Sequence, residues 1–291
     1  MSGRLPVWFK KKMPDPKALV NMESLLNELS LHTICESALC PNLGDCFARR
    51  TATFLILGDV CTRNCTFCAV KKGIPAPVDE DEPQHLAEAV KKLNLKHVVI
   101  TSVTRDDLPD GGASHFARVI SVLRERNGGL TIEVLIPDFC GSFGSLKTVV
   151  AARPDVINHN LETVSRLYPE VRPRADFNRS LRLLEQTKEL DSSIITKSGI
   201  MVGLGETRDE LFSTMQGLRN VNCDLLTIGQ YLSPSPAHYP VVRYVTPEEF
   251  AEYESTGRSM GFSGVASAPL VRSSFNAAQL YKTARRERTA P

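Results

Sequence analysis

The chain has 291 residues, of which 42% are hydrophobic and 23% charged, and its 35 basic and 33 acidic residues give a net charge of +2. A charge this close to neutral gives no reason to expect a nucleic-acid partner. No stretch approaches 18 consecutive apolar residues, so a membrane-spanning helix is not expected. The opening residues, MSGRLPVWFKKKMP, contain no apolar run typical of a secretory signal. We therefore expect a cytoplasmic protein with neither a membrane nor a nucleic-acid partner.

Residues 1–50 show little periodicity beyond a short helix expected at 21–29. From residue 53 onward, apolar runs typical of buried strands alternate with helical periodicity. Strands are expected at 53–57, 97–101, 131–136, 155–158, 194–202 and 225–228. Helices are expected at about 86–93, 115–126, 144–152, from about 161, 173–190, 209–219 and after 246. Two of these helices begin with capping boxes, Thr207 with Glu210 and Thr246 with Glu249.

Six strand–helix repeats with continuous apolar strands predict a parallel sheet that is buried on both faces. Six units rather than eight indicate an α/β fold of the partial (β/α)6 TIM-barrel type, in which the working loops follow the C-terminal ends of the strands. We expect a cluster-binding N-terminal extension (1–50), a barrel (51–262) and a C-terminal segment that closes over it (263–291).

Six of the eight cysteines lie within 34 residues, in two groups of three. The groups are Cys35, Cys40 and Cys46, and Cys61, Cys65 and Cys68. Disulfide frameworks are typical of short secreted chains, which this chain does not resemble. A structural zinc site takes four ligands, and no histidine lies at a usual finger spacing from either group. Iron–sulfur clusters normally take four thiolates as well, so two clusters would each leave one iron for a non-cysteine ligand.

The second group, Cys61-Thr-Arg-Asn-Cys-Thr-Phe-Cys68, resembles the CxxxCxxC motif of radical S-adenosylmethionine (SAM) enzymes, including the aromatic residue before the third cysteine. In that superfamily the three thiolates hold a [4Fe–4S] cluster. The resemblance implies that the fourth iron binds the amino and carboxylate groups of SAM.

The first group, placed ahead of this motif, resembles the lipoyl synthases, and the resemblance covers residues 30–281. Further matching segments are ITSVTRDDLPDGG (100–112), NHNLET (158–163), KSGIMVGLGET (197–207), LTIGQY (226–231) and VVRYVTPEE (241–249). The resemblance implies a sulfurtransferase that inserts sulfur at C6 and C8 of an octanoyl chain on a lysine of a carrier domain. The implied partners are octanoylated 2-oxoacid dehydrogenase E2 subunits or the glycine cleavage H protein, with a one-electron donor such as ferredoxin or flavodoxin.

The target bonds explain why such an enzyme needs a radical. An aliphatic C–H bond has no acidity that a side-chain base can use, so the hydrogen must leave as an atom, with a cofactor carrying the radical. The resemblance implies that one electron from the Cys61, Cys65 and Cys68 cluster cleaves SAM to a 5′-deoxyadenosyl radical. It also implies that the first group, Cys35, Cys40 and Cys46, holds an auxiliary [4Fe–4S] cluster that is consumed as the sulfur source.

The tail sequence Arg272-Ser-Ser-Phe275 resembles the family's Arg-Ser-Ser-Tyr, whose second serine ligates the auxiliary cluster. This implies that Ser274 is a ligand, and an oxygen ligand suits cluster iron less well than a thiolate, so its departure would free the iron that is lost with sulfide. From the local sequence alone, Ser273 and Ser274 favour a different role, the N-cap of a helix at 276–285. Phe275 and Asn276 depart from the family's usual Tyr and His.

Four further residues are candidate SAM contacts. Asn158 and Glu162 follow a strand and are equally well explained as SAM contacts or as strand-end caps. Arg174 meets either a carboxylate of the ligand or a neighbouring acidic side chain. Gly203 ends a strand, where a glycine would let the backbone approach the cofactor.

The remaining cysteines and histidines carry less weight. Cys140 and Cys223 are expected to be small buried residues. His32, His97 and His159 are expected to be structural.

Two other functions stay open. One is a different two-cluster radical SAM sulfurtransferase, such as an enzyme like biotin synthase. The other is a two-cluster electron carrier, which would need neither a barrel nor an iron without a cysteine ligand.

Overall fold

A single open sheet organises the protein. The computed structural model describes residues 5–11 and 15–289, and for residues 288 and 289 the backbone alone. The expected extension (1–50) and C-terminal segment (263–291) therefore each include residues outside this description. The sheet has eight strands in the order β1-β2-β5-β6-β7-β8-β9-β10, all parallel except β1. The strands are β1 (His32–Thr33), β2 (Thr53–Ile56), β5 (His97–Ser102), β6 (Thr131–Leu135), β7 (Val156–Asn158), β8 (Ile195–Val202), β9 (Leu225–Gln230) and β10 (Gly264–Ala268).

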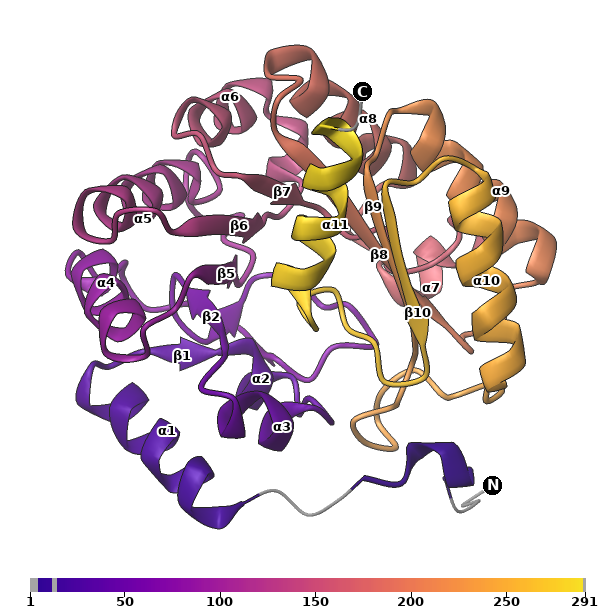
Figure 1. The fold of residues 1–291 in the computed structure, drawn as a ribbon, viewed down its shortest axis with the longest axis horizontal. Coiled ribbons are helices and arrows are strands. Elements are labelled where there is room, and N and C mark those ends of the chain that lie inside the picture. The colour runs from indigo at the N-terminus through magenta and orange to yellow at the C-terminus, as the bar shows by residue number, and fades with distance from the viewer. Residues whose placement is uncertain (1–4, 12–14, 290–291) are drawn as a thin grey trace.

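Helices form an outer ring around this sheet (Figure 1). Because strand order follows chain order, each helix packs outside the strands that it connects. The ring consists of α4 (Glu82–Lys92), α5 (Ala113–Arg126), α6 (Phe143–Ala151), α8 (Phe177–Leu190), α9 (Arg208–Asn220) and α10 (Pro247–Ser259). Five of the six predicted strand–helix units, the strand of the fourth unit and both capping boxes are confirmed.

The structure differs from the sequence-based expectations for the barrel at two elements. The helix expected from about residue 161 is absent, because Glu162 has a positive φ of 64° and only η3 (Ser165–Leu167) and the short α7 (Tyr168–Val171) follow it. The helix of the fourth unit is α8 instead. The strand β10 was missed because its sequence, GVASA, contains a single large apolar residue and so lacks the expected apolar run.

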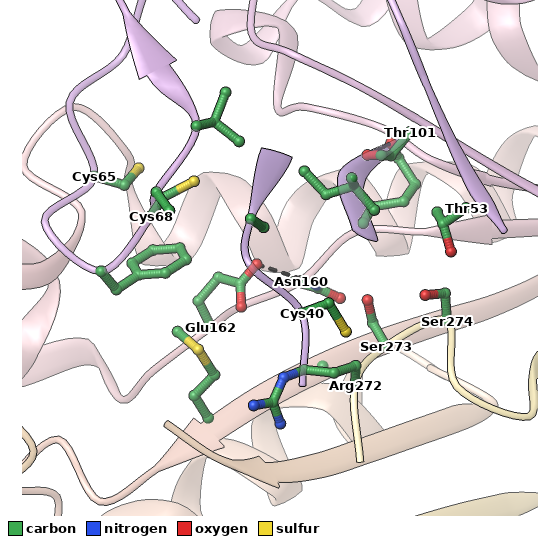
Figure 2. A pocket seen from close by; sticks show the side chains of 18 of the residues that line it. Cys40, Thr53, Cys65, Cys68, Thr101, Asn160, Glu162, Arg272, Ser273 and Ser274 are labelled. Atoms are coloured by element: carbon green, nitrogen blue, oxygen red, sulfur yellow. Dashed lines mark hydrogen bonds between the residues drawn. The ribbon is translucent and has the colours of Figure 1, made fainter. Parts of the chain in front are cut away.

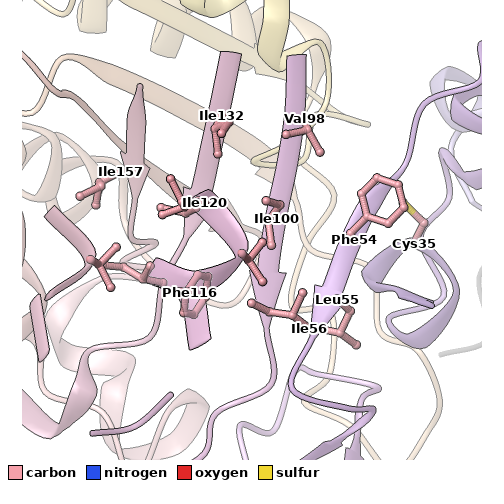
Figure 3. Close-up of a cluster of buried hydrophobic side chains, with 14 of the residues drawn as sticks. Cys35, Phe54, Leu55, Ile56, Val98, Ile100, Phe116, Ile120, Ile132 and Ile157 are labelled. Atoms are coloured by element: carbon pink, nitrogen blue, oxygen red, sulfur yellow. The ribbon is translucent and has the colours of Figure 1, made fainter. Parts of the chain in front are cut away.

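The core lies between the strands and the helices. The side chains of Phe116 and Ile120 on α5 meet those of Ile100 on β5 and Ile132 on β6, and all four are fully buried (Figure 3). Full burial of one such side chain contributes about 1.5–3 kcal/mol to folding. The sheet is thereby a rigid frame for the loops at the C-terminal ends of its strands.

Segments from both ends of the chain cover the barrel. The N-terminal part contributes η1 (Val7–Phe9), α1 (Pro16–Glu28), α2 (Ile34–Ser37) and α3 (Leu43–Ala48), and the short strands β3 (Val60–Cys61) and β4 (Lys71–Lys72) follow β2. The last helix, α11 (Ala277–Thr289), crosses between β5 and β10 in Figure 1. Its Leu280 and Ala284 pack on Val156, Ile195 and Leu225, the first residues of β7, β8 and β9. This helix therefore covers the end of the barrel opposite the strand C-termini.

The described residues contain no helix long and apolar enough to cross a membrane.

Candidate functional site

Both cysteine groups open into one cavity of about 510 Å³ at the C-terminal ends of the strands, within the range of about 300–1,000 Å³ usual for ligand sites. Its wall is mainly apolar and includes residues of β6, β8 and β9. The tail serines, Ser273 and Ser274, lie on this wall beside Cys40 (Figure 2). Five of the six clustered cysteines line it, namely Cys35, Cys40, Cys61, Cys65 and Cys68. The sixth, Cys46, is half-buried and packs against the core at the edge of the site.

The first triplet is positioned by two short helices. Thr33 caps α2 by accepting the backbone N–H of Glu36 at 3.3 Å. The end of that helix is closed by the N–H of Cys40, which donates to the carbonyl of Cys35 at 2.9 Å. Cys46 lies on α3, so one compact turn-and-helix segment carries all three thiols.

The tail docks directly on this segment. Asn42, which precedes α3, donates to the carbonyl of Leu270 at 2.7 Å. Beyond Cys46, the Arg49 guanidinium lies 5.5 Å from the ring centre of Phe275 and 3.5 Å from Oδ1 of Asn276. Phe275 and Asn276, which depart from the family pattern, thus contact Arg49 of the extension, while Ser274 lines the cavity.

A close backbone approach brings the tail to the sheet. A Cβ atom at Gly229, on β9, would lie 2.0 Å from the carbonyl oxygen of Val271. The glycine therefore allows the tail to lie on the strand and directs the next residue, Arg272, into the cavity near Cys40 and Glu162 (Figure 2). The hydrogen bond of its guanidinium goes to the neighbouring carbonyl of Val271 at 2.7 Å. Burial lowers the pKa of Arg272, so its surroundings favour a ligand or cluster of negative charge.

The second triplet sits in a loop that is held from several sides. The Cys61 sulfur accepts backbone N–H groups from Arg63 and Thr104, each at 3.4 Å. The buried Arg63 side chain pairs with Asp106 at 2.8 Å and with Asp138 at 2.6 Å. Hydrogen bonds to cluster sulfurs are one means by which a protein sets the potential of an iron–sulfur centre. The loop is therefore ordered by the chain itself.

The donor set fits metal clusters. All eight cysteines are free thiols. Burial raises the pKa of Cys35 and Cys68 to about 12 and also raises the pKa of Cys46 and Cys65. Such thiols ionise only beside a strong positive charge, which cluster iron supplies.

A single metal ion fits less well. In the part of the chain that the structure describes, no three His, Cys, Asp or Glu side chains converge on one ion position. A [4Fe–4S] cluster instead attaches each ligand to a different iron, so its ligands are spread more widely.

Polar groups opposite the second triplet come from the segment after β7. Asn160 donates to a carboxylate oxygen of Glu162 at 3.0 Å, and both side chains line the cavity (Figure 2). The Arg172 guanidinium fixes this turn by donating to the carbonyls of Asn160 and Leu161 at 2.9 and 3.1 Å. Burial raises the pKa of the Glu162 carboxyl. The pair presents hydrogen-bonding oxygens to the cavity, and a ligand with hydroxyl or cationic groups would match them.

Three of the four candidate SAM contacts, Asn158, Arg174 and Gly203, lie away from the cavity wall. Asn158 is fully buried, with its amide 3.5 Å from Glu133, which pairs with Lys197 at 2.7 Å inside the barrel. Arg174 donates to the carbonyl of Thr62 at 2.8 Å and so tethers the loop of the second triplet. The geometry supports a structural role for both residues.

Gly203 is explained by packing. A Cβ atom there would lie 2.0 Å from the side-chain nitrogen of Gln230, and the φ of Gly203 is +94°. Its N–H and that of Leu204 donate to Glu206 at 2.7 and 2.9 Å, so these amides are engaged within their own loop. Of the four sequence candidates, Glu162 alone lines the cavity.

The other two cysteines differ from each other. Cys223 is fully buried, as expected. Cys140 is exposed, which corrects the expectation, because it is the middle residue of a tight 3-10 turn (Phe139–Gly141) with a φ of +52°, and its thiol donates to Asp106 at 3.3 Å.

Sequence reasoning also missed Asn160 and Arg272 as residues of the wall. Asn160 stands in the quoted NHNLET segment and Arg272 in the tail motif, so both motifs pointed to the right segments without singling out these side chains.

Comparison with known proteins agrees with this geometry. The profile of the radical SAM superfamily matches residues 55–218. The lipoyl synthase of Caldanaerobacter subterraneus subsp. tengcongensis is 59% identical over 95% of this chain and 97% of its own length. That of Caldicellulosiruptor saccharolyticus is 56% identical over 97% and 99%. Among solved structures, HydG, a maturase of the [FeFe]-hydrogenase, shares the fold with a TM-score of 0.59 at 14% identity, covering 92% of this chain and 66% of that chain.

Proposed function

The chain belongs to the lipoyl synthase family of the radical SAM superfamily, and we propose that the cavity between its two cysteine groups holds the octanoyl-lysine side chain of a carrier protein between two [4Fe–4S] clusters. The observation that carries this proposal is that five cysteines from the two triplets and the tail serine Ser274 line the same cavity. Two sites that faced different cavities could not act on one aliphatic chain in turn.

Each part of the chain has its own task in this proposal. Cys61, Cys65 and Cys68 would hold the cluster that binds SAM, and Asn160 with Glu162 would bind polar groups of SAM from the opposite wall. The N-terminal extension (1–50) would hold the auxiliary cluster through its three cysteines, and the C-terminal segment (263–291) would add Ser274. The barrel (51–262) positions both. When bound, SAM and its cluster supply a hydrogen-abstracting radical, and the auxiliary cluster supplies the sulfur.

The residues between the clusters would orient the substrate and exclude water. The wall there is apolar, which suits an eight-carbon acyl chain and protects a radical from side reactions. Its apolar members include Leu55, Val103, Leu135, Ile200 and Met201. A reactive carbon must lie within contact distance of its partner, and a rigid barrel wall provides that placement.

The test is sulfur insertion by the anaerobically reconstituted chain. With SAM, a strong reductant and an octanoylated carrier domain, we expect 5′-deoxyadenosine and a product heavier by two sulfur atoms. A chain with Cys61→Ala should release no 5′-deoxyadenosine, whereas Cys35→Ala should release it without completing the product. Release of 5′-deoxyadenosine with sulfur insertion only into a desthiobiotin-type substrate would favour the biotin synthase alternative. No 5′-deoxyadenosine from the parent chain would favour an electron carrier.

The finer assignments rest on the same argument. E2 subunits and the glycine cleavage H protein are the carriers that we propose, with ferredoxin or flavodoxin as the one-electron donor. A reducing cytoplasm is the compartment that we propose, and the eight free thiols support it.

A further inference from the structure

Two short segments at the opening of the cavity expose apolar side chains to solvent, and we call them the cavity rim (residues 38–39 and 71–74). Leu39 is 66% exposed and lines the cavity directly before Cys40. Ile74 is 96% exposed and lies two residues after Lys72, which lines the cavity. Single exposed apolar residues are common on protein surfaces. Two of them at the opening of one catalytic cavity indicate a surface that a partner covers.

The conformation of Leu39 points the same way. Leu39 follows the last turn of α2 with a φ of +52°, a position that glycine usually occupies. A leucine in this left-handed conformation costs conformational energy, and a side chain that is 66% exposed recovers little of it by packing within the chain. A contact made outside the chain would account for the choice of residue.

The rim is also positively charged. The two lysines of β4 are both exposed, and Lys71 pairs with Asp59 at 2.7 Å. Lys72 has no ion-pair partner among the described residues. Its backbone lies beside Cys61 in the register of β3 and β4. The charge thus lies next to the SAM-cluster loop, and Leu39 lies next to the auxiliary site.

We propose that the cavity rim docks a folded carrier domain whose surface beside its octanoylated lysine is acidic and carries small apolar side chains. This inference rests on the proposed function, because a substrate that is a side chain of a protein brings that protein's surface to the opening. Leu39 and Ile74 contact the apolar part of that surface, and Lys72 attracts its carboxylates. Contact with both segments holds the lysine above the space between the two cluster sites.

The test compares a whole carrier domain with a short peptide that carries the same octanoyl-lysine. Binding of each to the reconstituted chain is measured by calorimetry for the parent, for Lys72→Glu and for Ile74→Ser. We expect each rim variant to raise the Kd of the domain at least tenfold. The factor by which the same variants raise the Kd of the peptide should be at least five times smaller than the factor for the domain, because the peptide lacks the docking surface. Added salt should weaken domain binding more for the parent than for Lys72→Glu.

Two matched control variants carry the same chemical changes elsewhere. Lys147→Glu reverses an exposed charge on α6, and Val20→Ser removes an apolar side chain that is 61% exposed on α1. Neither residue lines the cavity, and both controls should bind the domain as the parent does.

Three results would overturn the proposal. They are a domain Kd that is unchanged in the rim variants, equal losses for domain and peptide, and tight domain binding by Lys72→Glu, which would exclude an acidic partner face. Sulfur insertion into the peptide by the parent chain tests the proposed function separately, so docking can fail while that function stands.

Discussion

Replacement of Gly229 by alanine tests whether the tail must lie on β9 for the auxiliary site to work. The new Cβ would lie 2.0 Å from the Val271 carbonyl oxygen, whereas ordinary contacts begin at 3.4 Å, so the tail must move by about 3.4 − 2.0 = 1.4 Å. Arg272 and Ser274 follow directly and must move with it. A displacement of about 1 Å at reacting groups can cost about a hundredfold in rate. We expect Gly229→Ala to lower single-turnover sulfur insertion by about that factor.

The fold and the iron content should survive this change. All six clustered cysteines are untouched, and the strain falls on a segment outside the barrel core, where overpacking costs about 1–3 kcal/mol. The matched control is Gly217→Ala on α9, whose Cβ would meet Leu181 at an ordinary 3.6 Å. That change should stabilise the helix by about 0.5–1 kcal/mol and leave activity intact. The measurements are iron content, thermal unfolding and product mass. Sulfur insertion by Gly229→Ala at more than half the parental rate would refute the reasoning.

Three further changes probe other contacts. Ser274→Ala should abolish transfer of the second sulfur in a product-mass assay while Ser273→Ala retains it, and equal losses would argue against Ser274 as the ligand. Arg63→Ala leaves two carboxylates without their buried partner, so we expect a loss of about 3–5 kcal/mol in urea unfolding and lower iron occupancy of the SAM-binding site. Lys197→Met strands the fully buried Glu133 at a similar cost of about 3–5 kcal/mol at neutral pH. Although burial opposes it, the charge of Lys197 holds the pKa of Glu133 below its ordinary 4.5, so the pair stabilises the fold above that pH. The loss of unfolding free energy in Lys197→Met should therefore shrink as the pH falls below 4.5. A loss that does not depend on pH would contradict this reasoning.

The sequence predicted the fold well where one local signal was enough. Apolar runs marked six strands, because parallel strands covered by helices are buried on both faces. The strand β10 carries mostly small residues that its neighbours bury, so no apolar run marked it. The break at Glu162 depends on a backbone conformation that composition does not reveal.

Within the site, the cysteines were found because their spacing is itself the signal. The polar contacts were harder, because a side chain inside a strand and one just beyond it point to different surroundings. Asn158 is still in β7 and points into the barrel, whereas Asn160 and Glu162 have left the strand and face the cavity. The role of Arg272 depends on the path of the tail across Gly229, which only the folded chain shows.

The most direct test of the account is the iron and sulfide content of the chain after anaerobic reconstitution. Two independent [4Fe–4S] sites predict about eight iron and eight sulfide per parent chain, and about four of each for Cys35→Ala and for Cys61→Ala. Mössbauer and electron paramagnetic resonance spectra should show that each variant keeps a different cluster. One metal per chain, or loss of all iron in both variants, would contradict the account.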